Sequence, residues 1–192
     1  MLIKTLPVGQ LETNCYVVTN ENNLECVVID PGDESNTILD YIEDNKLTCK
    51  AIMITHGHFD HVGAVEQVRE ETNATLYINE RDSGDIKNYV NYDDGEIVSE
   101  AGLDFKIIAT PGHTPGGVII IVEDAIFTGD TLFLGSCGRT DLPGGDINQL
   151  MNSLKKICEI QGDYEIYPGH MGPSSLERER ALNFYCRKAQ NQ

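Results

Sequence analysis

Basic residues are scarce in this sequence, and long apolar runs are missing from it. Lys and Arg number 14 against 31 Asp and Glu, which gives a formal net charge of −17 at pH 7. Binding nucleic acid through a broad surface requires clustered Lys and Arg, so the composition argues against a nucleic-acid partner. No apolar run approaches the roughly 18 residues of a membrane span, and no basic amphipathic segment could anchor the chain. We therefore expect neither nucleic acid nor a membrane as a partner.

Short paired cysteine spacings are also lacking. The amino terminus has no apolar stretch of about 7–15 residues that could serve as a signal peptide. We therefore expect a reducing cytoplasm, in which the cysteines are small buried hydrophobic residues and not a disulfide framework. The six cysteines are Cys15, Cys26, Cys49, Cys137, Cys158 and Cys186.

Short runs rich in β-branched residues alternate with helical patterns, which predicts an α/β fold. The expected strands cover residues 25–29, 51–54, 105–109, 117–122, 125–127 and 164–167. The expected helices cover residues 34–45, 60–72, 146–159 and 174–188. The polar stretch 79–100 predicts a short helix and a surface loop. A length of 192 residues is enough to bury a two-layer core, so we expect one domain over residues 1–192.

All five histidines fall in the short turn segments that follow these strands, and three of them lie within residues 55–61 together with Asp60. Imidazole and carboxylate ligands together favour zinc, iron or manganese. Residues two apart in an extended loop can point both rings at one centre, while the next turn supplies Asp60 and His61. This pattern suits two metals better than one. A lone His113 or His170 would more often be a capping or hydrogen-bonding residue.

The order of these residues resembles the order of metal ligands in the metallo-β-lactamase superfamily. The segment Thr-His-x-His-x-Asp-His at 55–61 is followed by Thr-Pro-Gly-His at 110–113, Phe-Thr-Gly-Asp at 127–130 and Tyr-Pro-Gly-His at 167–170. The resemblance implies a four-layer αβ/βα sandwich with the metal site at the edge between two sheets. It implies that His56, His58 and His113 hold one metal, that Asp60, His61 and His170 hold the other, and that Asp130 bridges them.

The superfamily also places an acidic residue near the ligands where this chain has Asp30, in Val-Ile-Asp-Pro-Gly. We predict that Asp30 supports a ligand by hydrogen bonding and does not itself bind metal. Thr55 directly precedes His56, and we predict it to be a strand or turn residue.

Residues 129–141 look like the glyoxalase II group, the hydroxyacylglutathione hydrolases, and most like their short prokaryotic relatives. Full-length glyoxalase II enzymes carry an additional helical carboxy-terminal domain that helps to bind glutathione, and here only residues 171–192 follow the last ligand. Those enzymes have lysine where Arg139 stands and tyrosine where Asp141 stands. Arg139 can still bind a substrate carboxylate, whereas Asp141 would repel one. The alternative is that Arg139 forms a salt bridge to Asp141 or Asp146 that fixes the loop.

The expected reaction is hydrolysis of a small thioester such as S-lactoylglutathione. Two divalent ions, zinc first and iron or manganese as alternatives, lower the pKa of a bridging water to about 7, so a metal-bridging hydroxide is the expected nucleophile. Asp60 is the expected catalytic residue, which orients the hydroxide and accepts its proton. A thiol pKa of roughly 8.5 allows a thiolate to leave without a protein acid. Every histidine is already committed, so none is left to activate a serine or cysteine.

Several other functions share parts of this pattern. Persulfide dioxygenases match the run 137–141 more closely than glyoxalase II does, and they use one iron, which His56, His113 and Asp130 could hold as a facial triad. A β-lactamase is disfavoured because those enzymes generally have another residue at the position of Asp130, and because no export signal is found. The negative charge disfavours a nuclease. A non-catalytic metal-binding protein would need a closed coordination shell, whereas seven ligands around two metals leave room for water.

Overall fold

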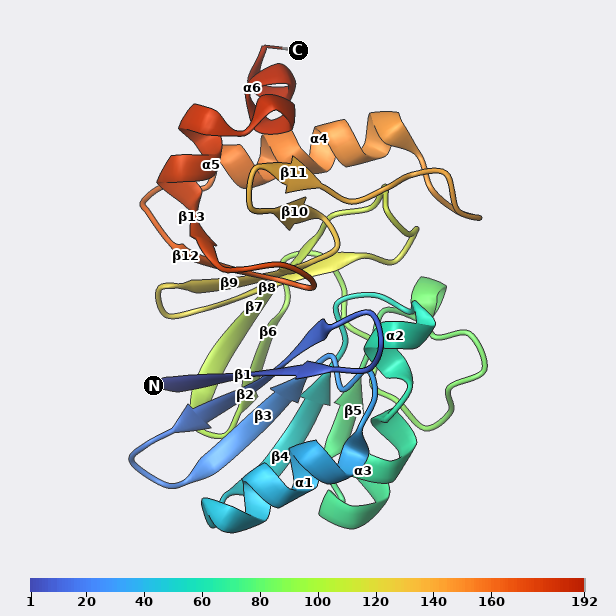
Figure 1. Ribbon diagram of the computed structural model, residues 1–192, viewed down its shortest axis with the longest axis vertical. Helices are drawn as coiled ribbons and strands as arrows, with labels where there is room; N and C mark the ends of the chain where they lie inside the picture. Colours follow the sequence, from blue (N-terminus) through green and yellow to red (C-terminus); the bar gives the residue numbers. More distant parts are fainter. Residues whose placement is uncertain (192) are drawn as a thin grey trace.

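Two β-sheets face each other at the centre of the computed structural model, which describes residues 1–191 (Figure 1). The first sheet has the strand order β1-β2-β3-β4-β5, in which β3 runs parallel to β4 and β4 parallel to β5. Its strands are β1 (Leu2–Val8), β2 (Thr13–Asn20), β3 (Glu25–Ile29), β4 (Thr48–Met53) and β5 (Thr75–Tyr77). Because β3 and β4 are parallel, Asp30 and the histidine segment that follow them lie at the same edge of the sheet.

The second sheet has the strand order β13-β12-β9-β8-β7-β6. Its strands are β6 (Ile97–Glu100), β7 (Leu103–Ala109), β8 (Val118–Val122), β9 (Ala125–Gly129), β12 (Glu165–Pro168) and β13 (Ser174–Ser175). A separate two-stranded hairpin consists of β10 (Leu132–Phe133) and β11 (Ser136–Cys137). Since β9 and β12 are parallel, Asp130 and His170, which follow them, also come out at one edge.

Helices cover the outer face of each sheet, so the molecule has four layers (Figure 1). Helices α1 and α3 pack on the first sheet, and α4 and α6 pack on the second. The helices are α1 (Ser35–Asp44), α2 (Phe59–Val62), α3 (Val65–Thr72), α4 (Ile147–Cys158), α5 (Leu176–Leu182) and α6 (Phe184–Gln190), with the 3₁₀ helix η1 (Glu80–Asp82). None of the helices within residues 1–191 is long and apolar enough to cross a membrane.

Alternating residues of the central strands belong to different apolar layers. Val28 of β3 packs with the helices α1 and α3, whereas Val27 and Ile29 pack between the two sheets. Strands that are buried on both faces are apolar along their whole length, which is why the sequence shows uninterrupted apolar runs. The α/β class and the αβ/βα arrangement expected from the sequence are confirmed.

Two of the expected helices are each divided. Residues 60–72 form α2 and α3, because the Ala64 N–H donates to the Pro31 carbonyl (3.0 Å) and so leaves the helical ladder. Residues 174–188 form β13, α5 and α6. Asn183 has extended backbone angles, and its side chain caps α6 by accepting from the N–H groups of Tyr185 and Cys186. The stretch 79–100 contains η1, as the predicted short helix, and also strand β6, which the sequence did not indicate.

Candidate metal centre

The predicted ligands lie at the edge where the strands of both sheets end. The loop after β4 and helix α2 contribute from the first sheet, and the β7–β8 loop and the turns after β9 and β12 contribute from the second. The structure brings all seven side chains together: His56, His58, Asp60, His61, His113, Asp130 and His170. Neither sheet alone provides a complete set, so the centre depends on how the two sheets pack.

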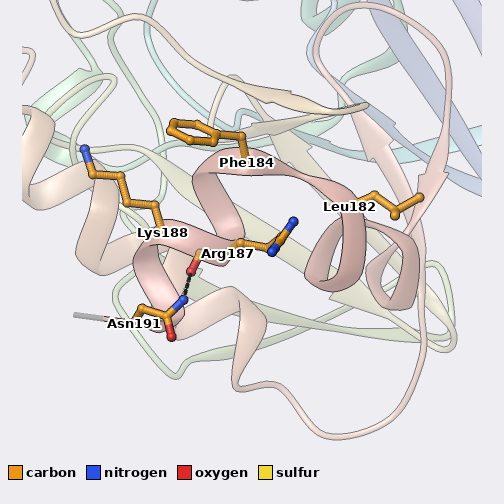
Figure 2. A pocket seen from close by; sticks show the side chains of 5 residues that line it. All are labelled: Leu182, Phe184, Arg187, Lys188 and Asn191. Carbon is orange, nitrogen blue, oxygen red and sulfur yellow. Dashed lines mark hydrogen bonds between the residues drawn. The ribbon is translucent and has the colours of Figure 1, made fainter.

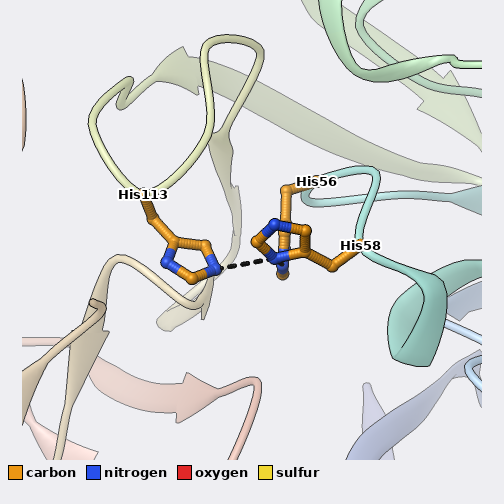
Figure 3. Close-up of side chains that lie close together, drawn as sticks. All are labelled: His56, His58 and His113. Carbon is orange, nitrogen blue, oxygen red and sulfur yellow. Dashed lines mark hydrogen bonds between the residues drawn. The ribbon is translucent and has the colours of Figure 1, made fainter. Parts of the chain in front are cut away.

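A first group of three imidazoles converges on one point. His58 Nδ1 lies 3.1 Å from His56 Nε2 and 2.9 Å from His113 Nε2 (Figure 3). Burial and the neighbouring imidazoles lower the pKa of His56, and burial followed by the proximity of His113 lowers the pKa of His58. His56 and His58 are therefore neutral at pH 7, which is the form that binds metal ions.

A second group contains a carboxylate and two imidazoles. Asp60 Oδ2 lies 3.2 Å from His170 Nε2 and 3.7 Å from His61 Nε2. A hydrogen bond with Asp60 is the largest cause of a raised pKa at His170. The Thr13 hydroxyl donates a hydrogen bond of 3.0 Å to the same Asp60 oxygen. This group thus offers two nitrogens and one charged oxygen.

Asp130 lies between the two groups. Its Oδ1 is 3.4 Å from His61 Nε2, and its Oδ2 is 3.4 Å from His113 Nε2 and 3.6 Å from His170 Nε2. One carboxylate therefore faces both groups, with one histidine of the first and two of the second in reach.

Two buried atoms in the centre lack a hydrogen-bond partner, namely His61 Nε2 and Asp130 Oδ1. They lie 3.4 Å apart without forming a hydrogen bond. Leaving such atoms unsatisfied costs about 1–3 kcal/mol each, and a cation beside both of them would satisfy them together. A set of imidazole and carboxylate donors suits zinc, iron or manganese. The residues present therefore fit the divalent metals that the sequence predicts.

The outer nitrogens of four of the imidazoles, those of His56, His61, His113 and His170, contact the surrounding chain. His113 Nδ1 donates to the Arg139 carbonyl (2.7 Å), and His170 Nδ1 donates to the Leu11 carbonyl (3.2 Å). These contacts leave Nε2 of both rings free to face the centre. His56 Nδ1 lies 3.2 Å from the Thr55 hydroxyl, and this contact likewise leaves Nε2 of His56 free to face the centre.

Asp30, predicted to support a ligand by hydrogen bonding, lies behind His61. Its Oδ2 lies 2.9 Å from His61 Nδ1 and accepts from the Thr55 hydroxyl (2.6 Å), and its Oδ1 accepts from the Thr55 N–H (2.7 Å). Burial lowers the pKa of His61, but the charges of Asp30 and Asp130 outweigh burial and raise that pKa to about 10. Asp30 is also close to His56 and His61 as a possible ligand group, but it faces the Nδ1 side of His61, away from the Nε2 atom that faces Asp130.

Arg139 makes a bidentate ion pair with Asp141, with distances of 2.6 Å from Nε to Oδ1 and 2.7 Å from the terminal nitrogen to Oδ2. Both side chains are exposed. This ion pair is the predicted alternative to substrate binding by Arg139. The predicted contact of the Arg139 side chain with substrate stays a prediction, while the Arg139 backbone already contributes by accepting from His113.

Sequence reasoning missed the contribution of the β1–β2 hairpin. Thr13 contacts Asp60, and the carbonyl of Leu11 contacts His170. No motif marks residues 9–14, and their proximity to the site follows only from the sheet order. Thr55, predicted as a strand or turn residue, also links Asp30 to His56.

Two cavities of about 270 Å³ lie on the surface. One is adjacent to the centre and is lined by Val8, Leu11, Thr13, Phe59 and Asp60, together with loop residues. The other lies on α5 and α6, and its lining shares no residue with the histidine groups (Figure 2). Only the first is in a position to hold a molecule that reacts at the centre.

Comparisons with known proteins agree with this geometry. Residues 8–170 match the family model described as the metallo-beta-lactamase superfamily. A relative in Haemophilus influenzae, hydroxyacylglutathione hydrolase GloC, is 32% identical, and the match covers 95% of this chain and 97% of that protein.

Three solved structures with the same fold are similar to this chain, and they are described as different kinds of protein. ETHE1 from Myxococcus xanthus superposes with a TM-score of 0.89 at 28% identity, covering 100% of this chain and 91% of its own. TTHA1623 in a di-iron-bound form has a TM-score of 0.85 at 31% identity, covering 95% and 99%. The BLEG-1 B3 metallo-beta-lactamase has a TM-score of 0.88 at 29% identity, covering 96% and 99%. On the extent of the family match and the assembled histidine and aspartate groups, this chain belongs to the metallo-β-lactamase superfamily.

Proposed function

We propose that this protein is a dinuclear metal-dependent hydrolase of small thioesters, with S-lactoylglutathione as the first substrate to test. Members of the superfamily are metal-dependent hydrolases. The observation that carries the proposal is the convergence of two ligand groups with Asp130 between them. The GloC relative, a hydroxyacylglutathione hydrolase matched along nearly the whole chain, supports the thioester as substrate.

The first ion would be held by His56 Nε2, His58 Nδ1 and His113 Nε2, the second by Asp60 Oδ2, His61 Nε2 and His170 Nε2, and both by Asp130. When bound, such ions supply Lewis acidity and lower the pKa of a coordinated water to about 7. We propose zinc, while iron and manganese suit the same nitrogen and oxygen donors. The di-iron form of TTHA1623 is a reason to test iron alongside zinc.

Asp60 is the proposed catalytic residue. Burial raises its pKa, but the hydrogen bond with His170 and the charge of His61 outweigh burial and hold that pKa below its usual range. The carboxylate is therefore ionised at neutral pH, so it can accept a hydrogen bond from the attacking water and orient it. The Thr13 hydroxyl fixes Oδ2 of Asp60 in place for this role.

A thioester needs no protein acid for its leaving group. All five histidines belong to the two ligand groups, so no imidazole is left to protonate a leaving alcohol or amine or to activate a serine or cysteine. A thiolate with a pKa of roughly 8.5 leaves as the anion. This favours a thioester over an ester or amide as substrate.

The cavity beside Asp60 provides a place for the acyl half of the substrate. Val8, Leu11 and Phe59 line it, and the side chain of Phe59 is 75% exposed at the surface. Apolar side chains stabilise a short acyl chain by removing it from water. The proposed partner is therefore a small thioester and neither a nucleic acid nor a membrane. The six free cysteines are compatible with the reducing cytoplasm that we propose as its compartment.

A mononuclear iron persulfide dioxygenase is the second candidate. The structural similarity to ETHE1 and the run 137–141 favour it. His113 Nε2 and Asp130 Oδ2, two of the three atoms that the facial triad requires, lie 3.4 Å apart. The same chain could thus hold one iron with the other ligand positions unused.

Turnover of S-lactoylglutathione by freshly purified protein of measured metal content tests the proposal. Free thiol is recorded in one channel, oxygen uptake on glutathione persulfide in a second, and hydrolysis of a cephalosporin in a third. Thiol release with about two metals per chain and no oxygen uptake supports the thioesterase. Oxygen uptake with about one iron per chain establishes the dioxygenase instead. Cephalosporin hydrolysis alone would assign a β-lactamase and overturn both proposals.

A further inference from the structure

Asp82, at the end of η1, contacts two loops that belong to different sheets. Its Oδ2 accepts a hydrogen bond from the Gly57 N–H (3.1 Å), and its Oδ1 accepts one from the Gly116 N–H (2.6 Å). Gly57 lies between His56 and His58, in the loop after β4 of the first sheet. Gly116 lies three residues after His113, in the β7–β8 loop of the second sheet.

Both loops approach η1 so closely that only glycine fits. A Cβ added to Gly57 would lie 2.0 Å from the Asp82 carbonyl oxygen, and one added to Gly116 would lie 2.6 Å from Asp82 Oδ1. Real side-chain carbons do not approach oxygen atoms at such distances. An alanine at Gly57 would push the loop away from the η1 backbone, and an alanine at Gly116 would displace either the loop or the Asp82 carboxylate.

The contacts of Asp82 are confined to the first histidine group. Together the two loops carry His56, His58 and His113, while the residues that touch His61 and His170 from behind are Asp30 and the Leu11 carbonyl. At their bases the loops are also joined by the hydrogen bond from the Val118 N–H to the Thr55 carbonyl (2.9 Å). Asp82 connects the same two loops a second time, at positions nearer to the histidines.

Among residues 1–191, no Lys, Arg or His forms a salt bridge with Asp82. The two groups that donate hydrogen bonds to its carboxylate are both backbone N–H groups. Hydrogen bonds to an ionised carboxylate are roughly twice as strong as those between neutral groups. The side chain is half-buried and is separated from the centre by the loops that it holds. A role in contacting substrate is therefore not indicated by its position.

We propose that Asp82 is a positioning residue that sets the separation between the His56–His58 loop and His113, and thereby the metal affinity of the first group. The inference rests on the proposed metal centre, but it does not depend on which substrate the enzyme uses. Removing one of the two hydrogen bonds lets one loop move relative to the other, so the three nitrogens no longer converge. The second group, which Asp82 does not contact, keeps its arrangement.

The test measures Co²⁺ affinity in proteins that retain one group each. His170→Ala damages the second group and leaves the first, and His113→Ala does the reverse. Asp82→Asn is then added to each, because an amide can accept at only one oxygen and presents N–H donors to the other backbone N–H. We expect a loss of Co²⁺ affinity of about 10–100-fold in the His170→Ala protein and less than about twofold in the His113→Ala protein. Asp85→Asn, an exposed residue three positions on, is the control with the same change in charge.

Equal losses in both backgrounds would reveal a general structural role and overturn the proposal, as would no loss in either. Asp82→Glu keeps the charge and moves both oxygens by one methylene, so it should show the same selectivity for the His170→Ala background with a smaller loss. If Asp82→Asn does not fold, the selectivity of Asp82→Glu decides between the two roles. Failure of the proposed function is distinguishable, because a protein that binds Co²⁺ tightly and hydrolyses no thioester would still respond to Asp82→Asn in this way.

Discussion

The two ligand groups share Asp130 but differ in their donor atoms and in the residues that support them. The first consists of three imidazoles on loops from both sheets, and the atoms behind them are a threonine hydroxyl and a backbone carbonyl. The second contains the carboxylate of Asp60, and a further carboxylate, Asp30, lies behind His61. We therefore expect metal affinity at the second group to depend largely on charge. At the first we expect it to depend on the alignment of loops that only the packing of the two sheets brings together.

Removing the shared carboxylate should have the largest effect. Asp130→Ala takes away the oxygens that face His61, His113 and His170, so both groups lose a ligand at once. We expect metal content to fall at both positions and kcat/KM to drop by more than about 10³-fold, since metal ions contribute several kcal/mol to such reactions. Metal analysis after dialysis, with steady-state kinetics, measures both. Loss of only one metal would show that Asp130 belongs to one group alone.

The next largest effect should come from breaking the first group only. His58→Ala removes the nitrogen that lies within 3.1 Å of both other members. One metal per chain should be lost and turnover should fall by roughly 10³-fold, while the second group retains its metal. Full activity in this variant, with metal content measured, would end the dinuclear scheme. Activity that is retained only with iron present would favour the mononuclear dioxygenase.

Asp30→Asn tests the charge behind the second group. The asparagine can still fill the space, but it removes the carboxylate that lies 2.9 Å from His61 Nδ1. Affinity for the second metal should fall by about 10–100-fold, and affinity for the first should change much less. Titration of the metal-free protein with Co²⁺, resolving two steps, checks the difference. A loss that is equal at both steps would contradict the separation of roles between the two groups.

The ligands could be predicted from the sequence because they lie in short motifs near strand ends, whose order resembles that of the metal ligands in the metallo-β-lactamase superfamily. Pro-Gly-His at 111–113 and 168–170 and the segment 55–61 carry their own signals, and all seven side chains lie together as expected. Two of the residues that support the ligands, Thr13 and Asp82, carry no such signal. Thr13 contacts Asp60, and Asp82 contacts the loops that carry the first histidine group, only because the tertiary fold places β2 and η1 there, which a local pattern does not encode.

The boundaries of elements show the same limit. The helical pattern over 60–72 is continuous in sequence, but the hydrogen bond from Ala64 to the distant Pro31 divides it into α2 and α3. Asn183 interrupts the pattern at 174–188 by capping a new helix with its side chain. In both cases a single tertiary or capping contact outweighs helical periodicity, and periodicity alone gives no sign of it.

The smallest effect is expected at the rim, where Arg139 is paired with Asp141. If Arg139 binds the carboxylates of a glutathione thioester, Asp141→Asn should free it and remove a repelling charge. KM for S-lactoylglutathione should then fall by up to about fivefold, since solvent screens an exposed ion pair and leaves it weak. Adding Arg139→Ala to this variant should raise KM again while kcat stays the same. An unchanged KM in both variants would show that the Arg139 side chain does not bind the substrate. Its roles would then be the ion pair with Asp141 and the backbone contact to His113, and the protein would recognise the acyl half of the thioester.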